Sequence, residues 1–386
     1  MSEGPLRLSL DVSAVPSRPG GAGYYTIELA RALCTHPAVD LTLVARRDDS
    51  ARWRALASDR ARVVAAVPGA RPARLAFEQV GFPALLRRLD VQVHHGPHYT
   101  MPLRAPVPCV VTVHDCTFFD HPEWHQRTKA VFFRRAIRRA AEKAAVIVCV
   151  SEVTAQRLHA CCTVRGPVTV IPHGVDHVRF TPDEPAPGAD DAQLGALGLR
   201  RDSRLVVFIG THEPRKGVAS LIEAFDRVAD AVPEAVLVLG GQPGWGLEEA
   251  ARALHAARHA DRIVRTGYLL DAAVPALLRR AAVVAYPAIE EGFGLPALEA
   301  LACGAPLVTT EGTAMAEVSR GAARLVPPGD AAALAAALAA ALGEGPDSPA
   351  ARERRLLGLA LAAEHTWDAS AERHVQAFNV ALAGRR

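Results

Sequence analysis

Short apolar runs alternate with stretches of helical character along the whole chain, and this alternation constrains the fold more than any other feature. Apolar runs of this length, bounded by glycine or polar residues, are typical of buried strands. Strands that alternate with helices favour a parallel sheet covered by helices on both faces. The predicted strands span residues 6–11, 41–45, 91–95, 110–114, 145–150 and 168–171 in the first half, and 205–210, 235–240, 263–267, 281–286 and 306–309 in the second half.

Length and composition divide these strands between two domains. A chain of 386 residues is long for one core, and half of its residues are hydrophobic. Residues 181–201 are rich in Pro, Gly, Ala and Asp, so we predict a linker there. Ligands of open α/β sheets bind at the carboxyl ends of the strands. We therefore expect an α/β protein in which Rossmann-like doubly wound domains, at 1–180 and 202–365, face each other across a cleft.

Charge, cysteines and hydropathy limit the partners and the location. The net charge of +3 suits a small anionic ligand or a transient membrane contact, and no nucleic-acid partner is expected. The seven cysteines are scattered and form no paired spacing, which favours a reduced cytosol. No run of 18 apolar residues occurs, so neither secretion nor membrane spanning is expected and a cytoplasmic location is predicted.

The segment between Glu291 and Glu299 holds the most specific pattern in the chain. Gly292 and Gly294 follow a predicted strand, and Pro296 suits the start of a helix. This arrangement predicts that Glu299 lies in the first turn of a short helix whose N-terminus can bind phosphate. Two acids beside a phosphate site are explained if they hold sugar hydroxyls, whereas the alternative is that both merely cap the helix.

Two adjacent cations, Arg215 and Lys216, follow the first strand of the second half. Cations at a helix start oppose the helix dipole, and a bound diphosphate would resolve this. Only three of the 44 basic residues are lysines, and Lys216 is the only one in the second half. We expect Lys216 to open a helix at the protein surface, and a solvated basic turn is the alternative.

These motifs resemble the donor site of the retaining glycosyltransferases of family 4, which have the GT-B fold. The resemblance implies that Glu291 contacts the hexose of a sugar nucleotide and Glu299 contacts the ribose. It implies that Lys216, with Arg215, holds the diphosphate. Further donor contacts are implied for the glycine turn and for a loop beside the nucleobase, namely Tyr268, Gly292, Phe293, Gly294 and Leu295.

Two features of the first half fit the same resemblance. A glycine cluster that contains Gly21 follows the first strand, as a phosphate-friendly loop would. Relatives often carry Arg where Tyr24 stands. His114 ends a predicted strand, and the resemblance implies that it orients the sugar and the acceptor. The alternative is a loop histidine with a purely structural role.

No metal or other cofactor is expected. His94, His95 and His98 invite a metal interpretation, but adjacent residues on a strand point to opposite faces. No Asp-x-Asp occurs in the chain, which argues against a metal-dependent transferase of the GT-A type.

Two helical segments complete the prediction. Residues 126–143 form a basic amphipathic helix, of a kind that can lie on an anionic membrane, although most such faces are simply solvated. In family 4 a C-terminal helix crosses back onto the first domain, and the resemblance implies this for 366–386.

The resemblance therefore implies a retaining, metal-independent hexosyltransferase. It implies GDP-mannose or a UDP- or dTDP-hexose as the donor, and the resemblance of the Glu-Pro-Arg-Lys segment leans toward mannosyl transfer. The acceptor would be a hydroxyl of a small molecule, a glycan or a lipid-linked glycan, with peripheral contact to the inner membrane face left open. The alternatives are a sugar-nucleotide 2-epimerase of the same fold and a sugar-nucleotide-binding protein without turnover.

Overall fold

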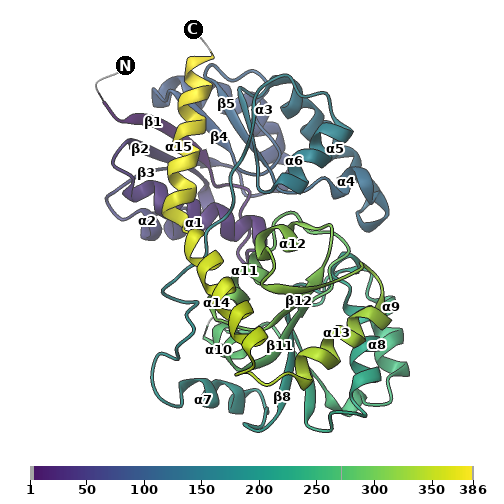
Figure 1. The fold of residues 1–386 in the computed structure, drawn as a ribbon. Helices are drawn as coiled ribbons and strands as arrows, with labels where there is room; N and C mark the ends of the chain where they lie inside the picture. The colour runs from purple at the N-terminus through teal and green to yellow at the C-terminus, as the bar shows by residue number, and fades with distance from the viewer. Residues whose placement is uncertain (1–3, 271, 385–386) are drawn as a thin grey trace. The chain divides into compact units, whose positions relative to one another are not determined.

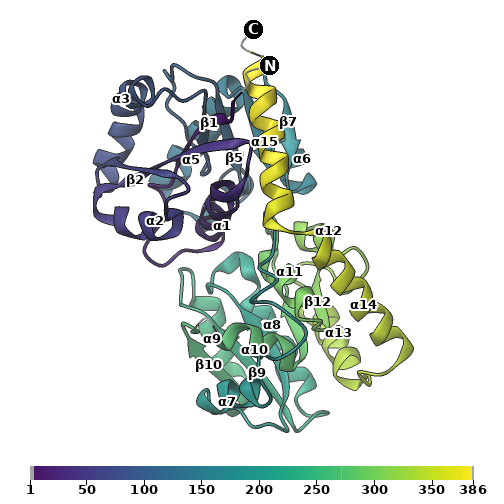
Figure 2. The ribbon, with the colours of Figure 1, turned by 90° about the vertical axis from the view of Figure 1, so that its left-hand side faces the viewer.

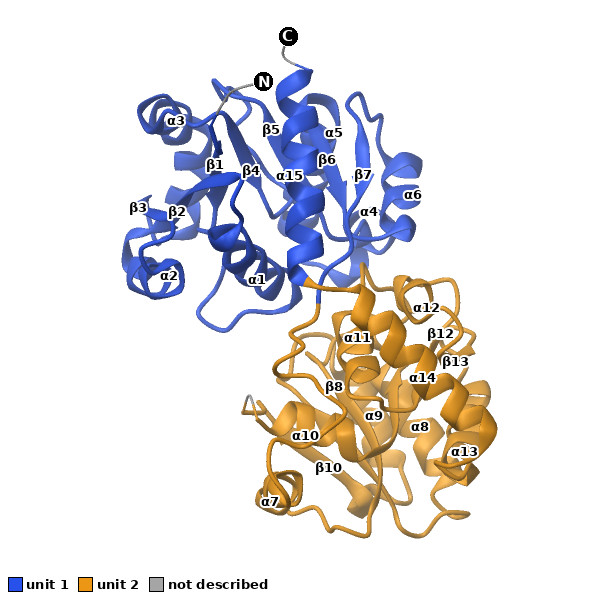
Figure 3. Cartoon of the chain, turned by 60° about the vertical axis from the view of Figure 1, so that its left-hand side comes forward, with its two compact units in different colours: residues 1–174, 367–386 blue, residues 175–366 orange. Residues whose placement is uncertain are grey.

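The computed structural model describes residues 4–270 and 272–384, which divide into two compact units. Unit 1 contains residues 1–174 together with 367–386, and unit 2 contains residues 175–366 (Figure 3). Unit 1 is thus assembled from two segments that are far apart in the sequence. Each unit carries one parallel sheet.

The sheet of unit 1 has the order β3-β2-β1-β4-β5-β6-β7, and every pair is parallel. The chain starts in the middle of the sheet, runs to one edge and then returns to build the other side, as in doubly wound folds. The switch point lies between β1 and β4. The strands are β1 Leu6–Asp11, β2 Val39–Arg46, β3 Arg62–Val67, β4 Val93–Gly96, β5 Cys109–Val113, β6 Val146–Cys149 and β7 Val168–Val170.

Helices cover both faces of this sheet because successive strand residues point to opposite sides. Val110 and Val148 pack with α1, α2 and α15, whereas Val111 and Ile147 pack with α5 and α6. The helix α3 packs over β2 and β3. The helices are α1 Gly21–Thr35, α2 Ser50–Ala57, α3 Arg71–Leu89, α4 Thr117–Asp120, α5 Arg127–Lys143, α6 Glu152–Cys161 and α15 Trp367–Ala383.

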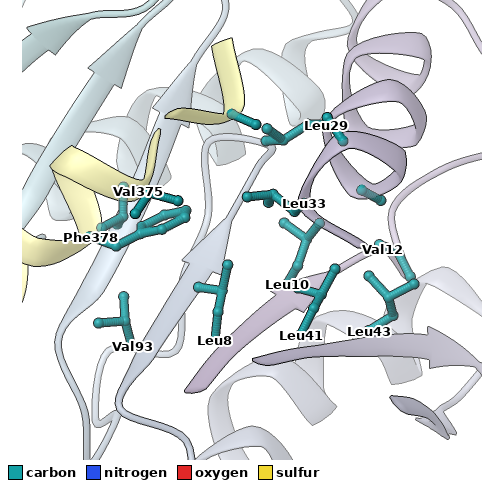
Figure 4. Packing of buried hydrophobic residues seen from close by; sticks show 14 of the residues in the cluster. Leu8, Leu10, Val12, Leu29, Leu33, Leu41, Leu43, Val93, Val375 and Phe378 are labelled. Carbon is teal, nitrogen blue, oxygen red and sulfur yellow. The ribbon is translucent and has the colours of Figure 1, made fainter. Parts of the chain in front are cut away.

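The helix α15 belongs to the core of unit 1, although it follows unit 2 in the sequence. Figures 1 and 2 both show it, in yellow, along the sheet and beside α1. Phe378 is fully buried and packs with Val375 near Leu8 and Val93 (Figure 4).

The sheet of unit 2 has the order β10-β9-β8-β11-β12-β13, with the same winding and a switch point between β8 and β11. All neighbouring strands are again parallel. The strands are β8 Arg204–Ile209, β9 Ala235–Gly240, β10 Ile263–Gly267, β11 Ala281–Tyr286, β12 Leu307–Thr310 and β13 Ala323–Val326. The helices are α7 Ala189–Ala196, α8 Val218–Val228, α9 Glu248–Ala256, α10 Ala273–Arg280, α11 Leu295–Ala302, α12 Ala314–Ser319, α13 Ala331–Gly343 and α14 Pro349–Glu364.

Residues 181–201, predicted as a linker, lie inside unit 2 and include α7. This segment is anchored because Leu194 is buried and Asp190 forms a buried ion pair with Arg279 on α10. Arg279 donates two hydrogen bonds to the Asp190 carboxylate, at 2.8 and 2.6 Å, and Nη1 donates to the carbonyl of Thr181.

Across residues 4–270 and 272–384, no helix combines the length and the apolar character needed to cross a membrane.

Candidate functional site

The candidate donor site lies at the switch point of unit 2, where the loops after β8 and β11 meet. The backbone N–H of Ile289 donates to the carbonyl of Arg215 at 2.7 Å, and Arg215 Nη1 donates to the carbonyl of Glu290 at 3.3 Å. Gly217 has φ 68°, and a Cβ there would come within 2.1 Å of the Pro287 carbonyl oxygen. Only glycine allows this approach of the two loops.

Glu291 holds both predicted phosphate-binding cations. Its Oε2 accepts a hydrogen bond from Arg215 Nη1 at 3.0 Å and another from Lys216 Nζ. The side chains of Lys216 and Glu291 are only 11% and 14% exposed, so the pair is largely removed from water. Arg215 Nε also donates to Glu213 Oε2 at 2.9 Å, so two cations face two carboxylates.

The charge states follow from these contacts. Burial alone would raise the pKa of Glu291, but the charges of Lys216 and Arg215 outweigh it and lower the pKa to about 2. Burial and the neighbouring charge of Arg215 lower the pKa of Lys216, and Glu291 partly opposes this shift. Glu291 is therefore a carboxylate at neutral pH.

The structure corrects the expected position of Lys216. Lys216 closes the 3-10 turn Pro214–Lys216 and is buried, rather than opening a helix at the surface. The helix α8 begins only at Val218, and Gly217 is its N-cap. Removing Lys216 would therefore change a buried ion pair.

The glycine turn leads into α11 as predicted, but Glu299 lies deeper in that helix. Gly294, with φ 98°, is the N-cap of α11 and accepts hydrogen bonds from the N–H groups of Ala297 and Leu298. The helix begins at Leu295, so the prediction that Glu299 lies in its first turn is wrong. Proline at the second helical position, instead of the first, accounts for the shift.

Glu299 occupies an environment that disfavours its charged form. Burial raises its pKa to about 7, although the charge of Arg179 acts in the opposite direction. The charge of Glu299 also contributes, after burial, to the raised pKa of Tyr286. The chain pattern gave no signal for Arg179 or Tyr286 as neighbours of Glu299.

The remaining predicted donor residues differ in exposure. Gly292 and Phe293 are buried, and the Phe293 ring lies 6.3 Å from that of His365. Leu295 is half-buried. Tyr268 directly follows β10 and keeps 55% of its surface exposed.

Gly21 and His114 belong to unit 1, whereas the other predicted site residues belong to unit 2. Gly21 is the first residue of α1, after the N-cap Gly20. A Cβ at either glycine would meet nothing of the protein within 4 Å, so the protein itself does not require glycine there.

His114 directly follows β5, is buried, and has a defined tautomer. Its Nε2 lies 2.8 Å from the carbonyl oxygen of Pro97, and because a carbonyl only accepts, Nε2 carries the hydrogen. Burial lowers the pKa of His114, so the ring is neutral at pH 7 and Nδ1 has a lone pair. This ring can therefore accept a hydrogen bond from a ligand hydroxyl at Nδ1.

The adjacent histidines His94 and His95 have different partners, whereas the ring of His98 lies 5.9 Å from that of His114. His94 contacts Ser9 Oγ at 3.2 Å and the ring of Phe82, whereas His95 contacts Thr112 and the rings of α15. Within the residues that the structure describes, no three His, Cys, Asp or Glu side chains are grouped as metal ligands.

Two family descriptions match this chain, one on each half. "Glycosyltransferase Family 4" matches residues 19–179, and "Glycosyl transferases group 1" matches residues 203–344. The two matches include every predicted site residue.

Curated relatives and solved structures show similarity to known enzymes. O-antigen chain mannosyltransferase B from Escherichia coli is 28% identical over 299 residues, which is 76% of each chain. D-inositol 3-phosphate glycosyltransferase from Kribbella flavida is 35% identical over 171 residues, 42% of this chain and 39% of that one. Sucrose-phosphate synthase from Thermosynechococcus elongatus superimposes with a TM-score of 0.75 at 19% identity, covering 97% of this chain and 98% of that chain.

Proposed function

Because this chain belongs to the glycosyltransferases of group 1 and family 4, with the GT-B fold, we propose that it transfers a hexose from a nucleotide diphosphate sugar to an acceptor hydroxyl. We further propose that transfer retains the anomeric configuration and needs no metal ion. The observation that carries the proposal is the largely buried cluster of Arg215, Lys216 and Glu291 at the switch point of unit 2.

In this proposal, Arg215 and Lys216 bind the donor diphosphate. Negative charge grows on the leaving diphosphate in the transition state, and fixed cations in a site with little water stabilise it. Before the donor binds, Glu291 provides the counter-charge that keeps both cations in place. The N-terminus of α8, beginning directly after this turn, adds its dipole to the same region.

Glu291 is proposed to hold the hexose as well. Both cations bind its Oε2, so Oε1 is available to accept a hydrogen bond from a sugar hydroxyl. Its depressed pKa keeps it ionised, which also suits stabilisation of positive charge on the sugar ring during transfer. It is not proposed as a nucleophile, because its charge is already engaged by two cations.

The other assignments follow the resemblance. Glu299 is proposed to bind the ribose, and Tyr268 to lie beside the nucleobase. The buried segment Gly292 to Gly294, Leu295 and the Gly21 loop are proposed to contact the donor. His114 is proposed to orient the hexose and the acceptor through the lone pair of Nδ1. With no separate nucleophile assigned, attack occurs on the face that the diphosphate leaves, and a phosphate oxygen takes the acceptor proton.

We propose mannose as the first hexose to test. The relative from E. coli is named as a mannosyltransferase, and the Glu213-Pro214-Arg215-Lys216 segment leans the same way. UDP- and dTDP-hexoses are the other donors to test, and the acceptor is proposed to be a small molecule, a glycan or a lipid-linked glycan.

The test is turnover of a panel of sugar nucleotides by purified protein, with and without acceptor and with excess EDTA. We expect release of nucleoside diphosphate that survives EDTA, and a product that keeps the donor's anomeric configuration by NMR. Lys216→Ala should lower the rate roughly 30- to 1000-fold, because one charge-assisted contact to the leaving group is lost. Lys143→Ala, at an exposed end of α5, is the matched control and should keep the wild-type rate.

Four outcomes would contradict the proposal. An inverted anomer or strict dependence on Mg²⁺ or Mn²⁺ would overturn the mechanism. Conversion of the donor sugar without an acceptor would indicate an epimerase. Near wild-type turnover by folded Lys216→Ala would remove the assigned phosphate site.

We also propose that α5 contacts an anionic membrane surface. Arg135, Arg138 and Arg139 are exposed on this helix, together with Val131, which is 45% exposed. Cosedimentation with phosphatidylglycerol vesicles should fall when Arg135 and Arg139 are both changed to Gln and when salt is raised. Equal binding to neutral vesicles would contradict this.

A further inference from the structure

A buried chain of hydrogen bonds in unit 1 joins the C-terminal helix to two strands and to α1. His374 Nδ1 lies 2.7 Å from the carbonyl oxygen of Ser370, one turn earlier in α15. His374 Nε2 lies 2.8 Å from the hydroxyl of Tyr25. That hydroxyl lies 2.8 Å from Thr112 Oγ1, which in turn lies 2.8 Å from His95 Nε2. All four side chains are buried.

Only one order of protons satisfies every bond in this chain. The carbonyl of Ser370 only accepts, so His374 Nδ1 carries a hydrogen. Burial lowers the pKa of His374 to about 4, so the neutral ring has a lone pair on Nε2 and accepts from Tyr25. The Tyr25 oxygen must then accept from Thr112, and the Thr112 oxygen must accept from His95.

His95, at the other end of this chain of hydrogen bonds, agrees with the inferred order of protons. The order places the hydrogen of His95 on Nε2 and a lone pair on Nδ1. Among the described residues, Nδ1 of His95 has no hydrogen-bonding partner. A buried N–H without a partner would be costly, so a bare nitrogen is the expected state at that position.

The ring of Tyr25, whose hydroxyl is held by these hydrogen bonds, also contacts the ring of His114. The two rings meet edge to face, with centroids 5.0 Å apart and an interplanar angle of 79°. The single hydrogen bond from His114 Nε2 to Pro97 fixes a direction but permits rotation of the ring about it. The ring of Tyr25 and the ring of Tyr99, whose centroid lies 5.6 Å from that of His114, restrict this rotation.

Two further contacts tie α15 to the same cluster. The ring of Tyr25 lies 4.7 Å from that of His173, and Trp367, the first residue of α15, stacks on His173 at 5.8 Å. Ser370 Oγ donates to the carbonyl of Pro172 at 2.9 Å.

We propose that Tyr25 and His374 are positioning residues: the hydrogen-bond chain from α15 fixes the ring of Tyr25, and that ring fixes the orientation of the His114 imidazole. The proposal rests on the proposed function only in assigning His114 a role in transfer. The proton order and the restriction of the His114 ring are properties of unit 1 alone.

The first test is nitrogen-15 NMR of the histidine rings in the full-length protein. We expect His374 to be the Nδ1–H tautomer, whereas His95 and His114 are Nε2–H tautomers. Tyr25→Phe keeps the ring but removes the hydroxyl, so it should broaden or shift the ring signals of His114. Val375→Ala, which removes buried packing from the next residue of the same helix, should leave those signals in place. An Nε2–H tautomer of His374, or unchanged His114 signals in Tyr25→Phe, would overturn the proposal.

The second test separates positioning from binding. Tyr25→Phe should lower kcat about 10- to 100-fold, as expected for a misplaced group, without changing the affinity for free nucleoside diphosphate. His374→Leu should have a similar effect, and the double variant should be no worse than either single variant because both substitutions break the same bond between Tyr25 and His374. Additive losses, or a loss in Val375→Ala as large as in Tyr25→Phe, would indicate a structural role only.

These readouts distinguish the two proposals. A wild-type protein that transfers no sugar would contradict the proposed function, and the NMR comparison would still decide the positioning role.

Discussion

At the scale of single residues, Glu291 and Glu299 are separated by their environments rather than by their chemistry. Two cations hold Glu291 ionised, whereas burial favours the protonated form of Glu299. Equivalent substitutions at the two sites should therefore have different effects.

Glu291→Gln should abolish transfer and keep or increase affinity for free nucleoside diphosphate. Removing the carboxylate charge frees Arg215 and Lys216 to bind phosphate, whereas the hexose loses its anchor. Glu299→Gln should instead weaken the binding of free nucleoside diphosphate, because the contact to the ribose is lost. Calorimetry with free nucleoside diphosphate compares the two, and greater weakening in Glu291→Gln would reverse the assigned roles.

Glu299 should also make the stability of unit 2 depend on pH. Its pKa is about 7 in the folded protein, above the usual 4.5, so between these values the folded state binds more protons than the unfolded state. Stability therefore falls as pH rises from 4.5 to 7 and levels off above 7, by about 3 kcal/mol at most. Urea midpoints of wild type and Glu299→Gln should diverge over this range, and parallel curves would contradict the shift.

The residue contacts were only partly predictable from the sequence. The pattern placed Arg215 and Lys216 after the first strand of the second half and Glu291 after the fourth, at the carboxyl ends where ligands of such sheets bind. It gave no strand order, and the pairing of β8 with β11 is what brings the three residues together. The sequence did not predict that Glu291 would pair with both cations. A bound diphosphate already accounted for the cations, and a bound sugar already accounted for the acid. The bond between Tyr25 and His374 joins residues 349 positions apart, and neither has a local signal.

At the scale of elements, the central strands were predictable and two edge strands were missed. β1, β9 and β11 agree with the predicted bounds because a strand with two neighbours needs a continuous apolar run. β10 also agrees with its predicted bounds, although it lies at a sheet edge. β3 and β13 lie at sheet edges. β13 has four residues, of which Leu325 is 45% exposed, so its apolar run is too short to stand out.

The helix α7 lies in a segment of loop-like composition, and one ion pair anchors it to the rest of unit 2. Asp190→Ala would leave the buried charge of Arg279 without its partner, and we expect a loss of about 3–5 kcal/mol in the unfolding of unit 2. Asp202→Ala is the control, because its pair with Arg200 is exposed and should leave the urea midpoint nearly unchanged. Equal effects of the two substitutions would contradict the assigned role of the Asp190 pair.

At the scale of the whole molecule, unit 1 depends on a helix that follows unit 2 in the sequence. Phe378→Ala should destabilise unit 1 by about 3–5 kcal/mol, because it opens a cavity in a fully buried position. Hydrogen exchange should increase in α1, β4 and β5 and stay unchanged in β8 and β11. Val380→Ala, at an exposed position of the same helix, is the control, and increased exchange throughout unit 2 would contradict the assignment of α15 to unit 1.

The discontinuity of unit 1 also sets the order of events on the ribosome. At about 5–20 residues per second, unit 1 waits roughly 10–40 s between the emergence of its first segment and the synthesis of α15. During this interval the apolar surface that Phe378 and Val375 later cover is exposed, and His95, Thr112 and Tyr25 lack the histidine that completes their chain. Unit 2 is continuous in sequence and can finish folding first. Nascent chains stalled before residue 367 should therefore be a preferred substrate of chaperones that recognise apolar surface.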